Sequence, residues 1–224
     1  MMSLTTFTLF EYGKKGDRSS VEHSNKMVSN LKACRVGFLD GYLKEIKSEH
    51  KGNQLESHIS SSSILIPIPK SAPLLIPTAQ WPAREICKVL LQNGFGGDAL
   101  ALIKRERAVP KAAFQKSSEA RPSVQIHLES LSIDKSVKPL NSLVEDIVLV
   151  DDVVTQGRTA MACYQLIMEE FKSASIKLFC PFRTVMNEID QWDKPKMGVI
   201  NYYESGKTFH RIDTAEDDFE GFFI

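Results

Sequence analysis

Two adjacent carboxylates, Asp151 and Asp152, stand where the sequence changes from a strand to a helix. An apolar, mostly β-branched run at residues 147–150 precedes them, which is typical of a parallel strand buried on both faces. A turn through residues 155–157 follows and leads into a helix. Binding sites in parallel sheets lie beyond the carboxyl ends of the strands. The order of these features therefore predicts a site that begins with the two carboxylates.

The turn after the carboxylates has the chemistry of an anion-binding site. The first backbone N–H groups of a helix have no partner within it, and the positive end of the helix dipole lies behind them. Gly157 permits close approach, and the hydroxyls of Thr155 and Thr159 add hydrogen bonds. Two carboxylates beside this turn can accept hydrogen bonds from vicinal hydroxyls. Taken singly, each residue also fits a plain strand end and helix cap, but the combination predicts a site for a ribose 5-phosphate group.

Strands and helices alternate through the middle of the chain, which predicts parallel βαβ units in a twisted sheet covered on both sides. A polar, basic loop is expected from residue 105 to about 121, and loops of that length are usually functional or disordered. The expected strands are 64–68, 99–104, 145–150, 176–182 and 198–203, the last of them near a sheet edge, and the expected helices are 81–93 and 157–171.

The chain is expected to divide into three segments. Residues 1–61 form an N-terminal accessory segment, with a strand at 6–12 and a helix over 21–46. Residues 62–184 form the core, and residues 185–224 form a C-terminal extension packed on it.

Composition narrows the classes of protein to which the chain can belong. Its 224 residues suit one α/β domain with additions, and 28 basic residues balance 28 acidic ones. Zero net charge makes nucleic acid an unlikely partner. The four cysteines are widely spaced and are interpreted as reduced thiols. No signal peptide and no apolar stretch long enough to span a membrane are recognised, which predicts a cytoplasmic protein with no membrane partner. Homodimer formation is left open.

Residues 147–159 resemble the phosphoribosyl pyrophosphate motif of type I phosphoribosyltransferases, with four apolar residues, two acidic residues and a turn containing Thr and Gly that enters a helix. The proline-bounded strand at 64–69, the basic stretch near 105–111 and Arg121-Pro122 extend the likeness over about residues 62–184. The layout is similar to the ComF-like branch, without the zinc-binding cysteine module that often precedes that domain. The first helix begins Trp81-Pro-Ala-Arg84 in place of that branch's Arg-Gly-Phe-Asn.

The resemblance implies a fold, a ligand and a set of site residues. The fold is α/β, with a Rossmann-like twisted, mainly parallel sheet flanked by helices, to which the N- and C-terminal additions contribute a hood. Asp151 and Asp152 are the implied catalytic residues and bind the ribose hydroxyls. The implied residues of the ribose 5-phosphate site are Asp151, Asp152, Val153, Val154, Thr155, Gln156, Gly157, Arg158 and Thr159. Those implied for pyrophosphate are Lys70, Ser71, Arg105 and Lys111.

The resemblance also implies a reaction. Phosphoribosyl pyrophosphate would transfer its phosphoribosyl group to a nitrogenous acceptor and release pyrophosphate. Mg²⁺ would be the cofactor, held through the ligand and indirectly by Asp151 or Asp152. Purine-specific relatives carry a carboxylate three residues after the second acidic position, where this chain has Thr155, which argues against purine salvage. The acceptor therefore stays unidentified.

Two other functions remain open at this point. One is a non-catalytic relative that senses the ligand or assists DNA handling as an accessory protein. The other is a different nucleotide-binding α/β protein, although neither G-x-G-x-x-G nor G-x-x-x-x-G-K-[ST] occurs in the chain.

Overall fold

The computed structural model describes residues 1–48, 53–76, 79–110, 121–137, 144–186, 188–189, 192–193, 195–203, 205–206 and 208–212. In chain order the elements are β1 (Met2–Tyr12), α1 (Arg18–Lys32), α2 (Gly37–Ser48), α3 (Asn53–His58), β2 (Ile64–Pro67), α4 (Pro82–Gln92), β3 (Asp98–Ala99), β4 (Ile103–Arg105), α5 (Val124–Leu128), β5 (Leu131–Ile133), β6 (Asp146–Val150), β7 (Val153–Val154), α6 (Arg158–Glu170), β8 (Ser175–Thr184), β9 (Lys196–Tyr202) and β10 (Thr208–Ile212). Among the described residues, no helix is long and apolar enough to cross a membrane.

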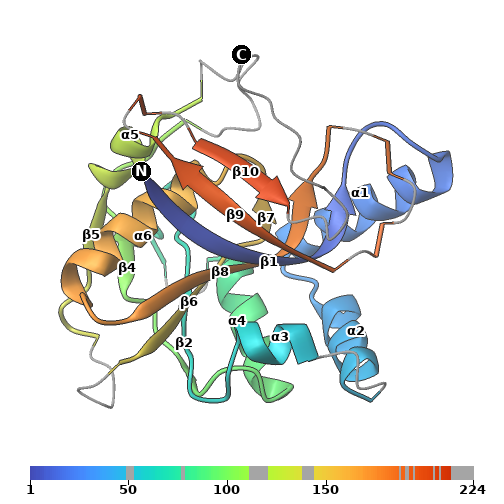
Figure 1. Cartoon of the computed structure of the whole chain (residues 1–224), viewed down its shortest axis with the longest axis horizontal. Helices are drawn as coiled ribbons and strands as arrows, with labels where there is room; N and C mark the ends of the chain where they lie inside the picture. Colours follow the sequence, from blue (N-terminus) through green and yellow to red (C-terminus); the bar gives the residue numbers. More distant parts are fainter. Residues whose placement is uncertain are drawn as a thin grey trace.

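A mainly parallel sheet forms the centre of the molecule (Figure 1). Its strand order is β10-β9-β1-β8-β6-β2-β3, and β7 pairs with β8 beside this path. Five neighbouring strands of this order, β1, β8, β6, β2 and β3, run parallel to one another. Strands β9 and β10 join antiparallel beside β1. The expected α/β class, with a mainly parallel sheet flanked by helices, is confirmed.

Strand β6 is buried on both faces, as its apolar run predicts. Val148 and Val150 pack into one core with helices α1 to α4, while Ile147 and Leu149 pack into a second core with α6. All four side chains are fully buried. The register pairs Val150 with Pro67 of β2 and with Phe179 of β8. Because both neighbours run parallel to β6, the chain leaves β6 at the edge of the sheet where ligands bind in such folds.

Strand β1 lies inside the sheet, between β8 and β9 (Figure 1). It pairs parallel with β8, with Phe10 opposite Phe182, and antiparallel with β9, with Thr6 opposite Gly198. The sheet therefore runs through all three segments expected from the sequence, because β1 belongs to residues 1–61 and β9 and β10 to residues 185–224. The boundaries after residues 61 and 184 stay a prediction.

The single helix expected over residues 21–46 is wrong. The chain forms α1 and α2 there instead, separated by a short turn. Cys34 in this turn has a φ of 60°, and the N–H of Arg35 donates to the carbonyl of Asn30 at 2.8 Å. One residue in the left-handed region ends a helix in this way. The apolar spacing continues across the turn because α1 and α2 bury their faces in the same core, so periodicity alone did not reveal the break.

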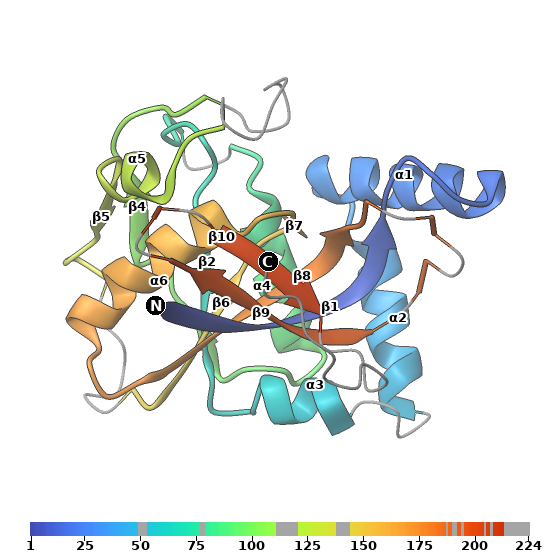
Figure 2. The same ribbon diagram turned by 45° about the horizontal axis from the view of Figure 1, so that its top comes forward.

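The strand expected over residues 99–104 is also wrong, because two short strands occupy this region. Strand β3 pairs with β2 in the main sheet, and β4 pairs antiparallel with β5 in a separate two-stranded sheet. The turn of helix α5 between β4 and β5 was not expected either. Figure 2 shows β4, β5 and α5 together beside α6, away from α1 and α2. Strand β9 is not the last, since β10 follows it and takes the edge.

Candidate functional site

A pocket of about 400 Å³ opens at the carboxyl ends of β1, β6 and β8. Its lining combines the turn between β6 and α6 with residues from β1, α1, α5 and β8. All nine residues predicted to hold a ribose 5-phosphate line it. The lining residues are Tyr12, Lys14, Lys32, Arg121, Pro122, His127, Asp151, Asp152, Val153, Val154, Thr155, Gln156, Gly157, Arg158, Thr159, Ala160, Leu178, Cys180 and Thr184.

Gly157 shapes the turn that enters α6. Its φ of 69° lies in the left-handed region, and it caps the helix without a side-chain hydrogen bond. A Cβ at this position would meet the Cδ1 of Ile200 at 2.3 Å. The first hydrogen bond of the helix joins the N–H of Met161 to the carbonyl of Gly157 at 2.8 Å. The N–H groups of Thr159 and Ala160 therefore precede the helical ladder and are left for another acceptor.

The carboxylate pair is fixed by the backbone around it. The N–H of Asp152 donates to Oδ1 of Asp151 at 2.9 Å, and the N–H of Val153 donates to Oδ1 of Asp152 at 2.8 Å. Burial raises the pKa of Asp151 well above its usual range, and the neighbouring Asp152 carboxylate raises it further, while Lys32 acts in the opposite direction. A carboxyl group whose charged form is disfavoured by its surroundings is typical of a binding or catalytic site.

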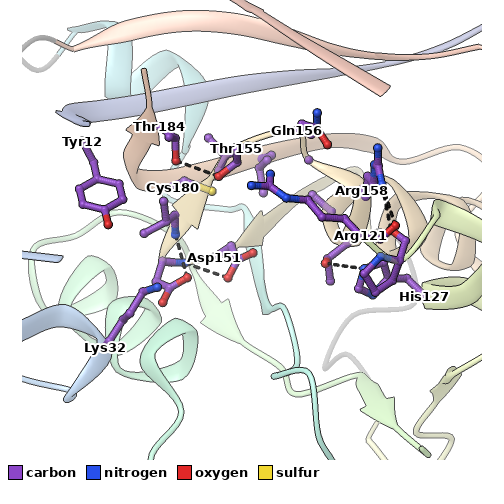
Figure 3. A pocket seen from close by; sticks show the side chains of 18 of the residues that line it. Tyr12, Lys32, Arg121, His127, Asp151, Thr155, Gln156, Arg158, Cys180 and Thr184 are labelled. Atoms are coloured by element: carbon purple, nitrogen blue, oxygen red, sulfur yellow. Dashed lines mark hydrogen bonds between the residues drawn. The ribbon is translucent and has the colours of Figure 1, made fainter. Parts of the chain in front are cut away.

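Positively charged side chains lie on both sides of the carboxylates. Figure 3 shows Lys32 on one side of Asp151, and Arg121 and Arg158 on the other. Nη1 of Arg158 donates to the carbonyl of Arg121 at 2.9 Å, which ties α6 to the residues that lead into α5. With Lys14, the pocket lining carries four cations against two carboxylates. Its net charge therefore favours an anionic ligand.

His127 is a site residue that sequence reasoning missed. Its side chain is only 5% exposed, and its Nε2 lies 3.4 Å from Oγ1 of Thr159. Burial, together with the charges of Arg105 and Arg158, lowers the pKa of His127 to about 4. No helix or strand was expected between about residue 121 and residue 145, so no signal in the sequence placed His127 beside α6.

Three buried nitrogen atoms lie in or beside this side of the pocket. Nδ1 of His127, Nε of Arg121 and Nη2 of Arg105 have no hydrogen-bond partner among the residues that the structure describes. Buried polar groups are nearly always paired, and a bound ion is one explanation for those that are not. The guanidinium groups of Arg105 and Arg121 add to the positive potential at the N-terminus of α6.

Replacing His127 with glutamine is expected to reduce the loss of stability in acid. The pKa of the imidazole is about 4 in the folded protein, so the ring stays neutral until the pH falls to about that value. In the unfolded chain the ring takes up a proton below about pH 6.5. Stability is therefore lost as the pH falls from about 6.5 toward 4. Glutamine does not titrate, so the variant should avoid roughly 2 kcal/mol of that loss. Urea unfolding at pH 7.5 and 4.5 measures the difference.

His58 provides the matched control for this prediction. Burial also lowers its pKa to about 4, and its Nε2 contacts the carbonyl of Leu178 at 2.9 Å, but it does not line the pocket. His58→Gln should change the acid response in the same direction without altering the site. An unchanged dependence of stability on pH in His127→Gln would contradict the description of this residue.

Three of the four residues predicted to grip pyrophosphate lie outside the pocket lining. Lys70 and Ser71 follow β2, and neither is among the described lining residues. Nζ of Lys70 donates to the carbonyl of Gln80 at 3.0 Å. Arg105 is 6% exposed, and its Nε donates to the carbonyl of Lys70 at 2.9 Å, so it supports the chain beside the pocket from within. Lys111 lies outside the described residues. The roles assigned to these four residues stay a prediction.

Where the structure describes them, the aromatic side chains near the C-terminus do not line the pocket. Trp192 instead packs against Phe10, with ring centroids 5.1 Å apart, and against His23, at 4.3 Å. Tyr202 packs at the second core, and Tyr203 is not among the described lining residues. The side chain of Phe209 lies outside the described part of the structure. Tyr12, at the end of β1, is the aromatic side chain that lines the pocket among the described residues.

Metal binding by the protein alone finds no support in the described residues, where no group of three or more His, Cys, Asp or Glu side chains is arranged to hold an ion. All four cysteines are free. The oxygens of Asp151 and Asp152 fit Mg²⁺ in another way, because this ion is usually bound by one or two carboxylates together with phosphates of the substrate.

Known proteins offer a loose structural likeness. No protein-family model matches the chain, and no curated protein matches it in sequence. Among solved structures, the xanthine-guanine-hypoxanthine phosphoribosyltransferase of Helicobacter pylori is similar over 82% of this chain and 84% of its own, with 9% sequence identity and a TM-score of 0.34. A superposition this loose carries no argument about ligand or activity.

Proposed function

We propose that this protein binds phosphoribosyl pyrophosphate in the pocket at the carboxyl ends of β1, β6 and β8, and that it is a phosphoribosyltransferase acting on a nitrogenous acceptor. One observation carries the proposal. The turn that follows β6 presents two carboxylates and an uncapped helix N-terminus to the same pocket. Carboxylates that can accept hydrogen bonds from hydroxyl groups, next to backbone N–H groups that can bind a phosphate, suit a ribose 5-phosphate.

Charge supports the position of the 5-phosphate in this proposal. The N–H groups of Thr159 and Ala160 begin α6, and Arg121 and His127 lie on the same side of the pocket. A phosphate at this place would be stabilised by the helix dipole and by charge-assisted hydrogen bonds. The ribose would then extend toward Asp151 and Asp152, whose carboxylate oxygens can accept hydrogen bonds from its two hydroxyls.

The proposed reaction exchanges bonds at C1 of the ribose. The bond from C1 to pyrophosphate breaks with its electron pair leaving on pyrophosphate, a bond to the acceptor nitrogen forms, and that nitrogen releases a proton. Positive charge develops on the sugar ring, and Asp151 and Asp152 lie where fixed negative charge would stabilise it. Mg²⁺, held by the carboxylates and the ligand's phosphates, would neutralise charge on the leaving group. The protein's own part is mainly to hold and orient the ligand.

A non-catalytic sensor is the second candidate, and a specific observation favours it. The side chains expected to grip pyrophosphate, Lys70, Ser71 and Arg105, are absent from the described pocket lining. A ligand site can survive without them, whereas turnover requires that the leaving group be stabilised.

Release of pyrophosphate distinguishes the two candidates. The protein is incubated with phosphoribosyl pyrophosphate, Mg²⁺ and a panel of nitrogenous bases and amines, and pyrophosphate is measured enzymatically. A transferase should release pyrophosphate with one acceptor class, and an Asp151→Asn/Asp152→Asn variant should not. Release that is absent over a broad panel, from protein that binds the ligand, would favour the sensor.

A further inference from the structure

The pocket carries positive charge at two ends, and the proposed 5-phosphate uses only one of them. Arg121 and Arg158 lie at the α6 end, while Figure 3 shows Lys32 at the opposite end, beyond Asp151. Tyr12 is labelled on the same side as Lys32, and Lys14, which also lines the pocket, follows Tyr12 by two residues. Strand β8 separates β1 from β6 in the sheet. The end of β1, which precedes Lys14, and the end of β6, which precedes the turn into α6, are therefore about two strand spacings apart, on the order of 10 Å. One ligand can reach both.

The lysine end is built by the N-terminal elements. Lys14 lies two residues after the end of β1, and Lys32 lies in the last turn of α1. Helix α1 is held against the sheet by buried Val28 and Leu31 and by the contact of His23 with Trp192. Lys32 is the last residue of α1, and the left-handed turn at Cys34 follows two residues later. The packing of α1 against the sheet therefore holds Lys32 at the pocket.

Neither lysine is neutralised by the described part of the protein. Both side chains are exposed, and neither Nζ has a hydrogen bond or ion pair within it. The charge of Lys32 does reach the carboxylate pair, because it lowers the pKa of Asp151 against the effects of burial and Asp152. The order across the pocket is cation, carboxylates, cation. This order matches a ligand with an anionic group at each end and hydroxyls between them.

We propose that Lys14 and Lys32 form a second anion-binding subsite, so that the protein selects sugar phosphates that carry, or are bound together with, a second anionic group on the C1 side. The inference rests on the proposed function, because it takes the 5-phosphate to occupy the α6 end. The second anion has two possible sources with the same chemistry, the pyrophosphate of the donor or a carboxylate of the acceptor. In either case the N-terminal segment, rather than the loop after β2, recognises it.

Calorimetric titration of the full chain tests the subsite with two probes, ribose 5-phosphate and phosphoribosyl pyrophosphate. The variant is Lys14→Met/Lys32→Met. Its matched control is Lys15→Met/Lys26→Met, which removes two exposed lysines from the same segment that do not line the pocket. The variant should bind phosphoribosyl pyrophosphate at least about tenfold more weakly, since charged hydrogen bonds are lost. Its affinity for ribose 5-phosphate should change less than about twofold, and the control should bind both probes as the wild type does.

A second titration identifies the source of the anion. Pyrophosphate and benzoate are each added to wild type and variant saturated with ribose 5-phosphate. Lysine-dependent binding of pyrophosphate assigns the subsite to the donor, and lysine-dependent binding of benzoate alone assigns it to the acceptor. The inference is overturned if neither anion binds and phosphoribosyl pyrophosphate gains nothing over ribose 5-phosphate, or if the variant and its control weaken all ligands equally. Failure of the wild type to bind ribose 5-phosphate would instead contradict the proposed function itself.

Discussion

Replacing Asp151 with asparagine is expected to stabilise the folded protein by about 1 kcal/mol at neutral pH, the size common for relief of functional strain. The carboxylate is costly where it stands, because burial and the charge of Asp152 raise its pKa well above the ordinary value. Asparagine keeps the shape and retains an oxygen that can accept from the N–H of Asp152. Asparagine removes only the charge, so the free-energy cost of holding a charged group in this buried place disappears.

The dependence on pH distinguishes this cause from a general effect on packing. Below the unfolded-state pKa, Asp151 is protonated in both states, and its titration costs the folded protein nothing. The cost appears as the pH rises from that value through the raised folded-state pKa. The advantage of Asp151→Asn, measured by urea unfolding, should therefore be small at pH 4 and grow toward pH 8.

Asp134 is the matched control with the opposite sign. Hydrogen bonds from Lys104 and Ser136 lower its pKa to about 2. Asp134→Asn should therefore destabilise the protein at neutral pH, and the difference should shrink as the pH falls through the folded-state pKa. An Asp151→Asn variant that is less stable than the wild type at pH 8 would contradict our description of the carboxylate pair.

Replacing Gly157 with alanine is expected to destabilise the protein by about 2–4 kcal/mol, from an unfavourable left-handed conformation and an overpacked contact. The φ of Gly157 is 69°, and its Cβ would lie 2.3 Å from Cδ1 of Ile200, a fully buried side chain of β9. The same change at Gly41, in an exposed turn of α2 where a Cβ meets nothing within 4 Å, should stabilise by about 1 kcal/mol.

A double-mutant cycle with Ile200→Val identifies the contact. Valine lacks Cδ1, and alone it should cost about 1 kcal/mol in this core. In the Gly157→Ala background it should cost less or become stabilising, because it removes the atom that the new Cβ meets. Additive effects of the two substitutions, measured by chemical denaturation, would show that Ile200 does not constrain the turn at Gly157.

The central strand and the turn of the site could be predicted because the residues that specify each of them are adjacent in the sequence. The run at residues 147–150 is apolar at every position, which is typical of a strand covered on both faces, and Gly157 stands where the turn into α6 needs a left-handed backbone. The helix expected over residues 81–93 and observed at Pro82–Gln92 was predicted for similar reasons, with Pro82 in its first turn and Gly94, at a φ of 78°, after its end.

The other half of the pocket could not be predicted, because it depends on contacts between distant parts of the chain. Nothing within residues 1–12 indicates that β1 pairs with β8, more than 160 residues away, and this pairing brings Tyr12 and Lys14 to the carboxylates. Likewise, the packing of α5 against α6 brings His127 to Thr159. Residues that meet only through the fold leave no spacing pattern in the sequence.

Titration calorimetry with phosphoribosyl pyrophosphate tests the central claim most directly, with and without Mg²⁺, on the wild type and on Asp151→Asn/Asp152→Asn. The wild type should bind, more tightly with Mg²⁺. The double variant, folded as judged by circular dichroism, should bind at least about 100-fold more weakly, because two charged acceptors of the ribose hydroxyls are lost. No binding by the wild type, or equal binding by the double variant, would contradict the assignment of Asp151 and Asp152 to a ribose 5-phosphate site.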